Sequence, residues 1–184
     1  MRGPRAGTLP ALMLGMVLLI GCGGGDKVSG PPPAAPARIH LESSAFGAGA
    51  TIPGEFTCDG AGRRPPLRWT GVPRSARSLA LLVEDPDAPG GTFVHWTAWG
   101  IAPSASGLSG KVPPGAKEGE NSFGDTGWGA PCPPEDASPH RYVFRLYALR
   151  HDLPLDRGAE PGKVRNAIAD EAIAQGALSA RYGR

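Results

Sequence analysis

The strongest hydrophobic pattern in the chain is a pair of strands separated by a rigid polar turn. Ser78–Glu84 contains five consecutive apolar residues, and such a run predicts a central strand covered on both faces. Phe93–Ile101 alternates instead, which places Phe93 and His95 on one face of a second strand. In the intervening DPDAPGGT, the prolines cannot donate to a sheet and the Gly-Gly pair turns the chain. We therefore expect the two aspartates of this turn at a rigid rim of the sheet.

The remaining pattern predicts a mostly β, sandwich-like domain with one late helix. His140–Leu149 alternates over its whole length, and shorter strands are expected at Ile39–Leu41 and Leu67–Trp69. Lys163–Ala180 repeats apolar residues at helical spacing and is predicted as the helix. Ser104–Asp125 is polar and rich in glycine, and it is predicted as a long loop. Many short strands and a single helix favour two packed layers of sheet.

The N-terminal region has the pattern of an exported, lipid-anchored protein. Its apolar stretch, Leu9–Ile20, is too short to span a membrane comfortably and suits a signal peptide. Cys22 follows this stretch directly, as in a bacterial lipobox, and this similarity implies cleavage before Cys22 and lipid attachment to it. An ordinary signal peptide or an uncleaved anchor is the alternative. We predict a signal peptide at 1–21, a tether rich in Gly and Pro at 22–37 and a folded domain at 38–184, located in the cell envelope.

Composition and charge narrow the class of partner. The 28 Gly and 21 Pro indicate a body rich in turns, not a helical bundle. The chain has 19 Lys and Arg against 17 Asp and Glu, and removal of Arg2 and Arg5 with the signal peptide leaves 17 of each sign. A neutral mature chain without a run of basic residues argues against nucleic acid as a partner.

Two histidines are the main candidates for binding chemistry. His95 and His140 each lie on a predicted strand beside a rim stiffened by proline. A neutral imidazole donates one hydrogen bond and accepts another, and a nearby carboxylate selects the tautomer. Together with backbone N–H groups of glycine-rich turns, two such rings could hold a phosphate-like anion. The alternative is that both histidines are structural.

Other chemistry is less well supported by the residue pattern. A Cys/His metal site lacks ligand pairs of the C-x-x-C kind. Cys132 could be a nucleophile with a histidine as base, but flanking prolines do not activate a thiol. Asp85 and Asp87 could form an acid–base pair or bind calcium, although Pro86 interrupts the strand and calcium needs more oxygen ligands. We predict no metal, no cofactor and no catalysis.

The motifs occur in an order that resembles the phosphatidylethanolamine-binding protein family, in its bacterial Raf-kinase-inhibitor-like branch. The resemblance covers about Ile39 to Arg184 and rests on FTCDG, PPLRW, DPDAP, VHW, GAPCPP and HRY. It implies a two-sheet β-sandwich with a C-terminal helix and a small pocket for phosphate or phospholipid-headgroup anions. Carried over motif by motif, the pocket residues would be Asp85, Asp87, Pro89, His95, Pro133, Pro134, His140 and Tyr142.

The resemblance implies a ligand-binding role. It does not identify one specific activity, because the activities of the family are too diverse to transfer one of them. We expect a non-enzymatic binding protein for anionic small molecules or headgroups, attached to the membrane through Cys22. The alternatives are an inhibitor of a peptidase or kinase that acts through the pocket rim, and a hydrolase that uses the Asp/His cluster. Four positions depart from the family pattern, and they bear on the ligand preference more than on the fold. They are Arg64, Trp128, Ala130 and Glu171. Ala130 is expected to narrow the pocket.

Two cysteines remain besides the one predicted to carry lipid. Cys58 and Cys132 both lie in the motif loops, and an exported protein meets an oxidising compartment. We consider a disulfide between them, which would add about 4 kcal/mol by closing a long loop. The alternative is two free thiols.

Overall fold

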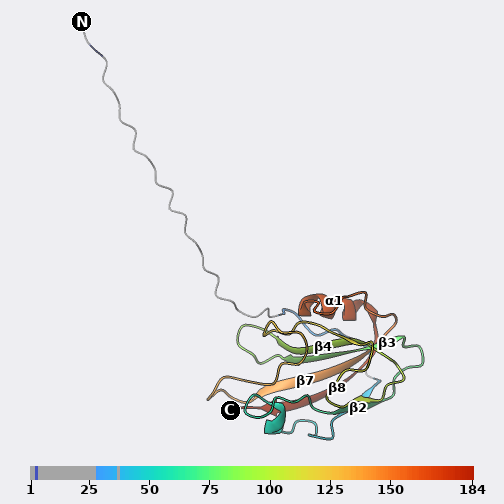
Figure 1. Cartoon of the computed structure of the whole chain (residues 1–184), viewed down its shortest axis with the longest axis horizontal. Coiled ribbons are helices and arrows are strands. Elements are labelled where there is room, and N and C mark those ends of the chain that lie inside the picture. Colours follow the sequence, from blue (N-terminus) through green and yellow to red (C-terminus); the bar gives the residue numbers. More distant parts are fainter. Residues whose placement is uncertain (1–2, 4–27, 37) are drawn as a thin grey trace.

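The computed structural model describes residues 3, 28–36 and 38–184, and this part of the chain folds into two antiparallel sheets and one α-helix. The large sheet has the strand order β6-β4-β3-β7-β8 and the small sheet has the order β1-β2-β5. Figure 1 shows α1 on one side of the large sheet and the small sheet on the other. The elements are β1 His40–Glu42, β2 Leu67–Thr70, β3 Ser78–Asp85, β4 Phe93–Ile101, β5 Gly107–Leu108, β6 Lys117–Glu118, β7 His140–Leu149, α1 Pro161–Glu171 and β8 Ala172–Tyr182, with a 3-10 turn at Gly54–Phe56.

The prediction of a central strand is confirmed by β3. All eight of its residues are buried, and it pairs with β4 on one side and β7 on the other. β4 and β7 also have the predicted bounds, Phe93–Ile101 and His140–Leu149. Because the three strands alternate in direction, the end of β3 lies beside the beginnings of β4 and β7.

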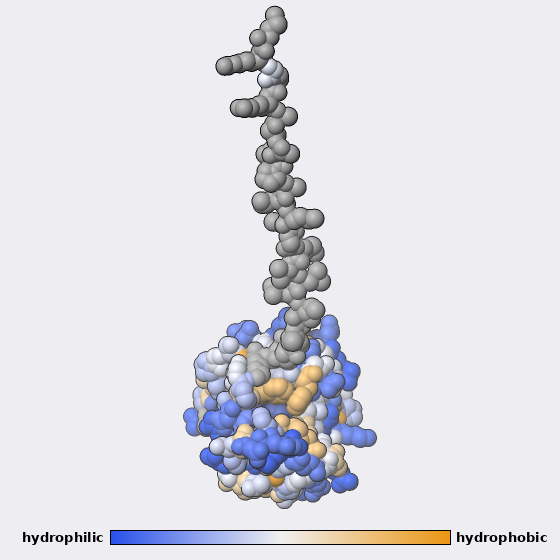
Figure 2. Space-filling model, turned by 90° about the vertical axis from the view of Figure 1, so that its left-hand side faces the viewer, coloured by the Kyte–Doolittle hydropathy of each residue, from blue (hydrophilic) through white to orange (hydrophobic). Residues whose placement is uncertain are grey.

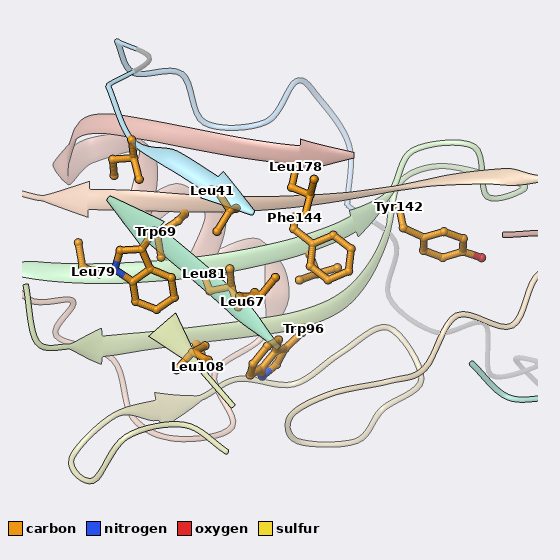
Figure 3. Close-up of a cluster of buried hydrophobic side chains, with 14 of the residues drawn as sticks. Leu41, Leu67, Trp69, Leu79, Leu81, Trp96, Leu108, Tyr142, Phe144 and Leu178 are labelled. Atoms are coloured by element: carbon orange, nitrogen blue, oxygen red, sulfur yellow. The ribbon is translucent and has the colours of Figure 1, made fainter. Parts of the chain in front are cut away.

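A hydrophobic core fills each side of the large sheet. On one side, side chains of the small sheet such as Leu67 and Trp69 pack across β3 and β7 (Figure 3). On the other side, Val164 and Ile168 of α1 are fully buried against the same sheet. The predicted sandwich with a helix near its C-terminus is therefore the observed architecture.

The predicted helix Lys163–Ala180 is wrong in its second half. α1 ends at Glu171, and Ala172–Tyr182 forms β8 along the edge of β7. This segment alternates between core and solvent, and Gly176 passes so close to the carbonyl oxygen of Ile39 that an added Cβ would lie 2.3 Å from it. Small residues such as Ala and Gly satisfy helical and strand periodicity equally well, so the unpaired edge of β7 decides between them.

Two other predictions need correction. The loop predicted at Ser104–Asp125 contains the two-residue strands β5 and β6, which extend the small and the large sheet. Residues 28–36, expected to belong to the tether, lie along the domain instead: Pro33 is buried, and its carbonyl oxygen accepts a 3.1 Å hydrogen bond from the Tyr147 hydroxyl. Because proline has no backbone N–H, this Pro-rich segment does not join a sheet ladder, and its carbonyl groups accept hydrogen bonds from side chains of the domain.

The predicted signal peptide apart from residue 3, the predicted lipidation site Cys22 and the first part of the tether lie outside the described residues. In the part of the chain that the structure describes, no helix has the length and apolarity needed to cross a membrane.

Candidate functional site

The predicted site residues meet in a small cavity at the end of the large sheet where β3 ends and β4 and β7 begin. The cavity has a volume of about 160 Å³. Seven of the eight predicted residues line it, and Figure 2 views the molecule from this end. Its walls are formed by Asp85, Ala88, Pro89, Phe93, His95, Phe123, Cys132, Pro133, Pro134, His140 and Tyr142.

A larger hollow of about 620 Å³ lies over the outer face of the small sheet. Its walls carry solvent-facing side chains of β1 and β2, such as His40, Glu42 and Arg68, and none of the predicted site residues. The polar side chains of the larger hollow face solvent, whereas the smaller cavity gathers buried polar side chains from β3, β4 and β7. We therefore take the smaller cavity as the candidate functional site.

Asp85 holds His140 in one orientation at the floor of the cavity. The Nδ1 atom of His140 lies 2.7 Å from Oδ2 of Asp85, and both side chains are almost fully buried. The other oxygen of Asp85 accepts the backbone N–H of Asp87 at 2.8 Å. The carboxylate selects the tautomer that carries its proton on Nδ1, which leaves Nε2 of His140 for a ligand.

His95 is a neutral hydrogen-bond acceptor. Its Nδ1 donates to the carbonyl oxygen of Gly129 at 2.9 Å, so that Nε2 carries the lone pair. Burial lowers the pKa of His95 from 6.5 to about 4, and the positive charge of a protonated His140 acts in the same direction. The Gly129 hydrogen bond and the charge of Asp85 oppose this shift without cancelling it. His95 is therefore uncharged at neutral pH.

Tyr142 brings a hydroxyl group without a protein partner to the cavity. The residue is fully buried, and its hydroxyl makes no hydrogen bond to any of the described residues. Figure 3 shows the ring beyond the end of the core cluster with the hydroxyl pointing away from it. Burial, followed by the negative charge of Asp85, raises the pKa of Tyr142, so the hydroxyl remains protonated. An unsatisfied buried hydroxyl is costly, which makes it a candidate ligand contact.

Asp87 is the predicted site residue that does not line the cavity. Its side chain is 40% exposed and turns toward Arg141, whose backbone N–H it accepts at 2.9 Å and whose guanidinium lies 3.3 Å away. Asp87 thus joins the DPDAP turn to the beginning of β7 and positions the rim without facing the cavity.

Two aromatic walls of the cavity were not among the predicted site residues. Phe93 shares the face of His95 on β4, with ring centroids 4.9 Å apart, and this shared face was visible in the alternation of the sequence. Phe123 packs edge-on against Phe93 at 4.6 Å. Phe123 comes from the long loop, where no local sequence signal indicates which side chains turn inward.

A disulfide joins the proline rim to the FTCDG loop. Cys58 and Cys132 are bonded, with Cα atoms 5.3 Å apart, and the N–H of Cys58 donates to the carbonyl oxygen of Pro131 at 3.0 Å. With its sulfur in this bond, Cys132 has no thiolate with which to act as a nucleophile. Among the described residues, no group of three or more His, Cys, Asp or Glu side chains could hold a metal ion.

The departures from the family pattern lie outside the cavity wall. Arg64 pairs with Glu118 at 2.8 Å and lies 5.0 Å over the ring of Trp96. Trp128 donates to the carbonyl oxygen of Gly62 at 3.1 Å. Ala130 does not line the cavity, so the expected narrowing by its methyl group is not observed. Glu171, at the end of α1, lies 3.0 Å from a ring nitrogen of a surface histidine.

The comparisons with known proteins agree with this architecture. The family model described as phosphatidylethanolamine-binding protein matches residues 42–183. A Mycobacterium tuberculosis protein that is named as a lipoprotein, LppC, is 40% identical over an alignment of 200 positions that covers 97% of this chain and 97% of that protein.

Two crystal structures share the fold over most of the domain. A phosphatidylethanolamine-binding protein homologue from Chlamydia trachomatis is 38% identical with a TM-score of 0.74, covering 80% of this chain and 98% of that one. YbcL of E. coli, described as a member of the mammalian family, is 31% identical with a TM-score of 0.77, covering 80% of this chain and 99% of that one. From the family model, the sequence identities and the shared fold, the chain belongs to the phosphatidylethanolamine-binding protein family.

Proposed function

We propose that this protein is a non-enzymatic binding protein for phosphate and phospholipid-headgroup anions, anchored in the cell envelope. The observation that carries the proposal is the unpartnered hydroxyl of Tyr142, buried in a cavity shared with two oriented imidazoles. Nothing in the described protein satisfies this group, so a ligand oxygen in the cavity would remove the cost of leaving it unbonded.

The polar groups of the cavity form a set with defined roles. Tyr142 donates through its hydroxyl, and Nε2 of His140 donates when that ring is protonated. His95 accepts at Nε2 because its Nδ1 is bonded to Gly129. Two donors match two oxygens of a phosphate group, and the acceptor matches a ligand that carries its own proton, either a P–OH or the ammonium group of a headgroup.

The affinity should be low and the binding reversible. No Lys or Arg is among the residues that line the cavity, and Asp85 places a negative charge at its floor. A protonated His140 is balanced by Asp85, so an anion gains hydrogen bonds without a strong net attraction. Such a site exchanges its ligand readily, as expected of a carrier or sensor of abundant headgroups.

Two further considerations support binding without catalysis at a membrane. The cavity offers no activated nucleophile, since its cysteine is in a disulfide and Asp85 is held by His140 and the Asp87 amide. The name of the mycobacterial relative describes a lipoprotein, which agrees with lipid on Cys22 of this chain.

Titration of the mature chain carrying Cys22→Ser tests the pocket. The imidazole NMR signals of His95 and His140 are followed during addition of inorganic phosphate, phosphoethanolamine or dimethyl phosphate. We expect both rings to respond at millimolar ligand, with the weakest binding for dimethyl phosphate because it has no proton to offer His95. Tyr142→Phe should weaken binding about tenfold, given about 1.5 kcal/mol for a hydrogen bond to a charged group.

Tyr147→Phe is the matched control, because it removes a buried hydroxyl from the same strand but from the opposite side of the sheet. Equal weakening by both variants, or no response of either imidazole, would reject the pocket. Intact inhibition of a target peptidase or kinase by a Tyr142→Phe chain that no longer binds phosphate would favour the inhibitor alternative. Turnover of a phosphoester that His140→Ala abolishes would favour the hydrolase.

A further inference from the structure

The N-terminal segment of the domain leads the chain to the rim of the cavity. We name residues 28–36 the strap. Pro33 and Ala35 of the strap accept hydrogen bonds from Tyr147 at 3.1 Å and from Gln175 at 2.8 Å. At its beginning, the N–H of Val28 donates to the carbonyl oxygen of Thr92 at 3.2 Å. Thr92 directly precedes Phe93, which forms part of the cavity wall.

A buried charge cluster holds the middle of the strap. Arg165 of α1 is 5% exposed and donates to the carbonyl oxygens of Gly30 and Pro31 at 3.2 and 2.9 Å. The same guanidinium lies 3.1 Å from Glu84 of β3, which is 2% exposed. Contacts of this kind, spread over the whole strap, make it a part of the domain and not a flexible spacer.

The docked strap leaves only a short connection to the membrane. Six residue steps separate Cys22 from Val28, and a fully extended chain of that length spans at most about 20 Å. A strand of nine residues such as β4 is about 30 Å long. If the far end of the sheet faced the bilayer, Thr92 would lie beyond the reach of Cys22.

The end of the molecule that carries the cavity has an apolar surface. Figure 2 shows an apolar patch bordered by hydrophilic residues at this end. Phe123 lies at the mouth of the cavity and is 49% exposed. Among the described residues, it is the one large apolar side chain that is exposed. An exposed aromatic ring beside a lipid anchor suits insertion into the headgroup region of a bilayer.

We propose that the cavity end of this protein docks on the lipid surface in which Cys22 is anchored. The cavity then opens toward headgroups of that surface, and Phe123 lies at the interface. This inference rests on the proposed lipidation of Cys22 and on the proposed binding of headgroups. The short connection, more than the affinity of the cavity, keeps the two surfaces together.

Photo-crosslinking of the lipidated mature chain tests the orientation. A photoreactive phenylalanine analogue replaces Phe123 at the cavity end or, as a matched control, Arg150, which is exposed just beyond the opposite end of β7. The protein is reconstituted in vesicles of phosphatidylethanolamine and phosphatidylglycerol. We expect several-fold more lipid adduct from position 123 than from position 150. A flexible Gly/Ser insertion of about 20 residues after Gly25 should reduce the yield at position 123 to that of the control.

Equal yields at the two positions, an insertion without effect, or a mature chain without lipid on Cys22 would overturn the orientation. Phosphate titration of the Cys22→Ser chain is run in parallel. Retained phosphate binding without preferential crosslinking rejects the orientation alone. Loss of phosphate binding with preferential crosslinking rejects the proposed ligand but leaves the docked surface in place.

Discussion

The disulfide at the cavity rim provides a prediction whose magnitude follows from the chain length it closes. Cys58 and Cys132 are 74 residues apart, and closing a loop of that size lowers the entropy of the unfolded chain by an amount equivalent to about 4.5 kcal/mol at 25 °C. The double substitution Cys58→Ser/Cys132→Ser should therefore lower the free energy of unfolding by several kcal/mol. For a domain of this size, that corresponds to a Tm lower by about 10–15 °C.

Urea and thermal unfolding of the Cys22→Ser chain measure this effect without a third cysteine. Dithiothreitol should destabilise the chain with the disulfide to the level of the double variant and leave the variant unchanged. Reduction should also weaken phosphate binding, because Cys132 and the two prolines after it form one wall of the cavity. A stability difference below about 1 kcal/mol, or two free thiols by mass analysis under non-reducing conditions, would refute the reasoning.

Three further predictions concern buried groups. The pKa of His95 is about 4 in the folded protein and about 6.5 in the unfolded chain, so the free energy of unfolding should fall by about 3 kcal/mol as the pH decreases from 6.5 to 4. Urea unfolding across this pH range should show the decrease, and the decrease should be smaller in His95→Gln. Arg165→Met leaves the carboxylate of Glu84 partly unpaired and should cost about 3 kcal/mol in urea unfolding, whereas adding Glu84→Gln should recover part of that loss. Gly176→Ala should lower the Tm by several degrees, corresponding to about 2 kcal/mol, because its Cβ would meet a backbone carbonyl oxygen at 2.3 Å; Gly47→Ala, with open space around it, is the control and should leave the Tm unchanged.

The parts of the fold predicted from sequence are those with a dominant local signal. The apolar run of β3 and the alternation of β7 each predict a strand and no other element. The prolines of DPDAP end the hydrogen-bonded pairing of β3 whatever the tertiary structure, because they have no N–H to donate. The segment after Glu171 has no such signal. It consists mainly of small residues, and the open edge of β7 made it a strand.

The candidate site shows the same division. The chemistry of His95 and His140 was visible in the motifs, and their common cavity follows from β4 and β7 flanking one strand. The outward turn of Asp87 was not visible, because it depends on where Arg141 lies. Phe123 reaches the cavity from a loop whose path is set by tertiary contacts.

The sequence by itself determined the β architecture, the rigid corners and the identity of the groups that can bind, since periodicity, proline geometry and side-chain chemistry act over a few residues. Only the tertiary structure decided which of those groups share a cavity, where α1 ends, and that the strap belongs to the domain. These depend on hydrogen bonds and packing between residues far apart in the chain, such as Tyr147 with Pro33, and a linear pattern carries no measure of that proximity.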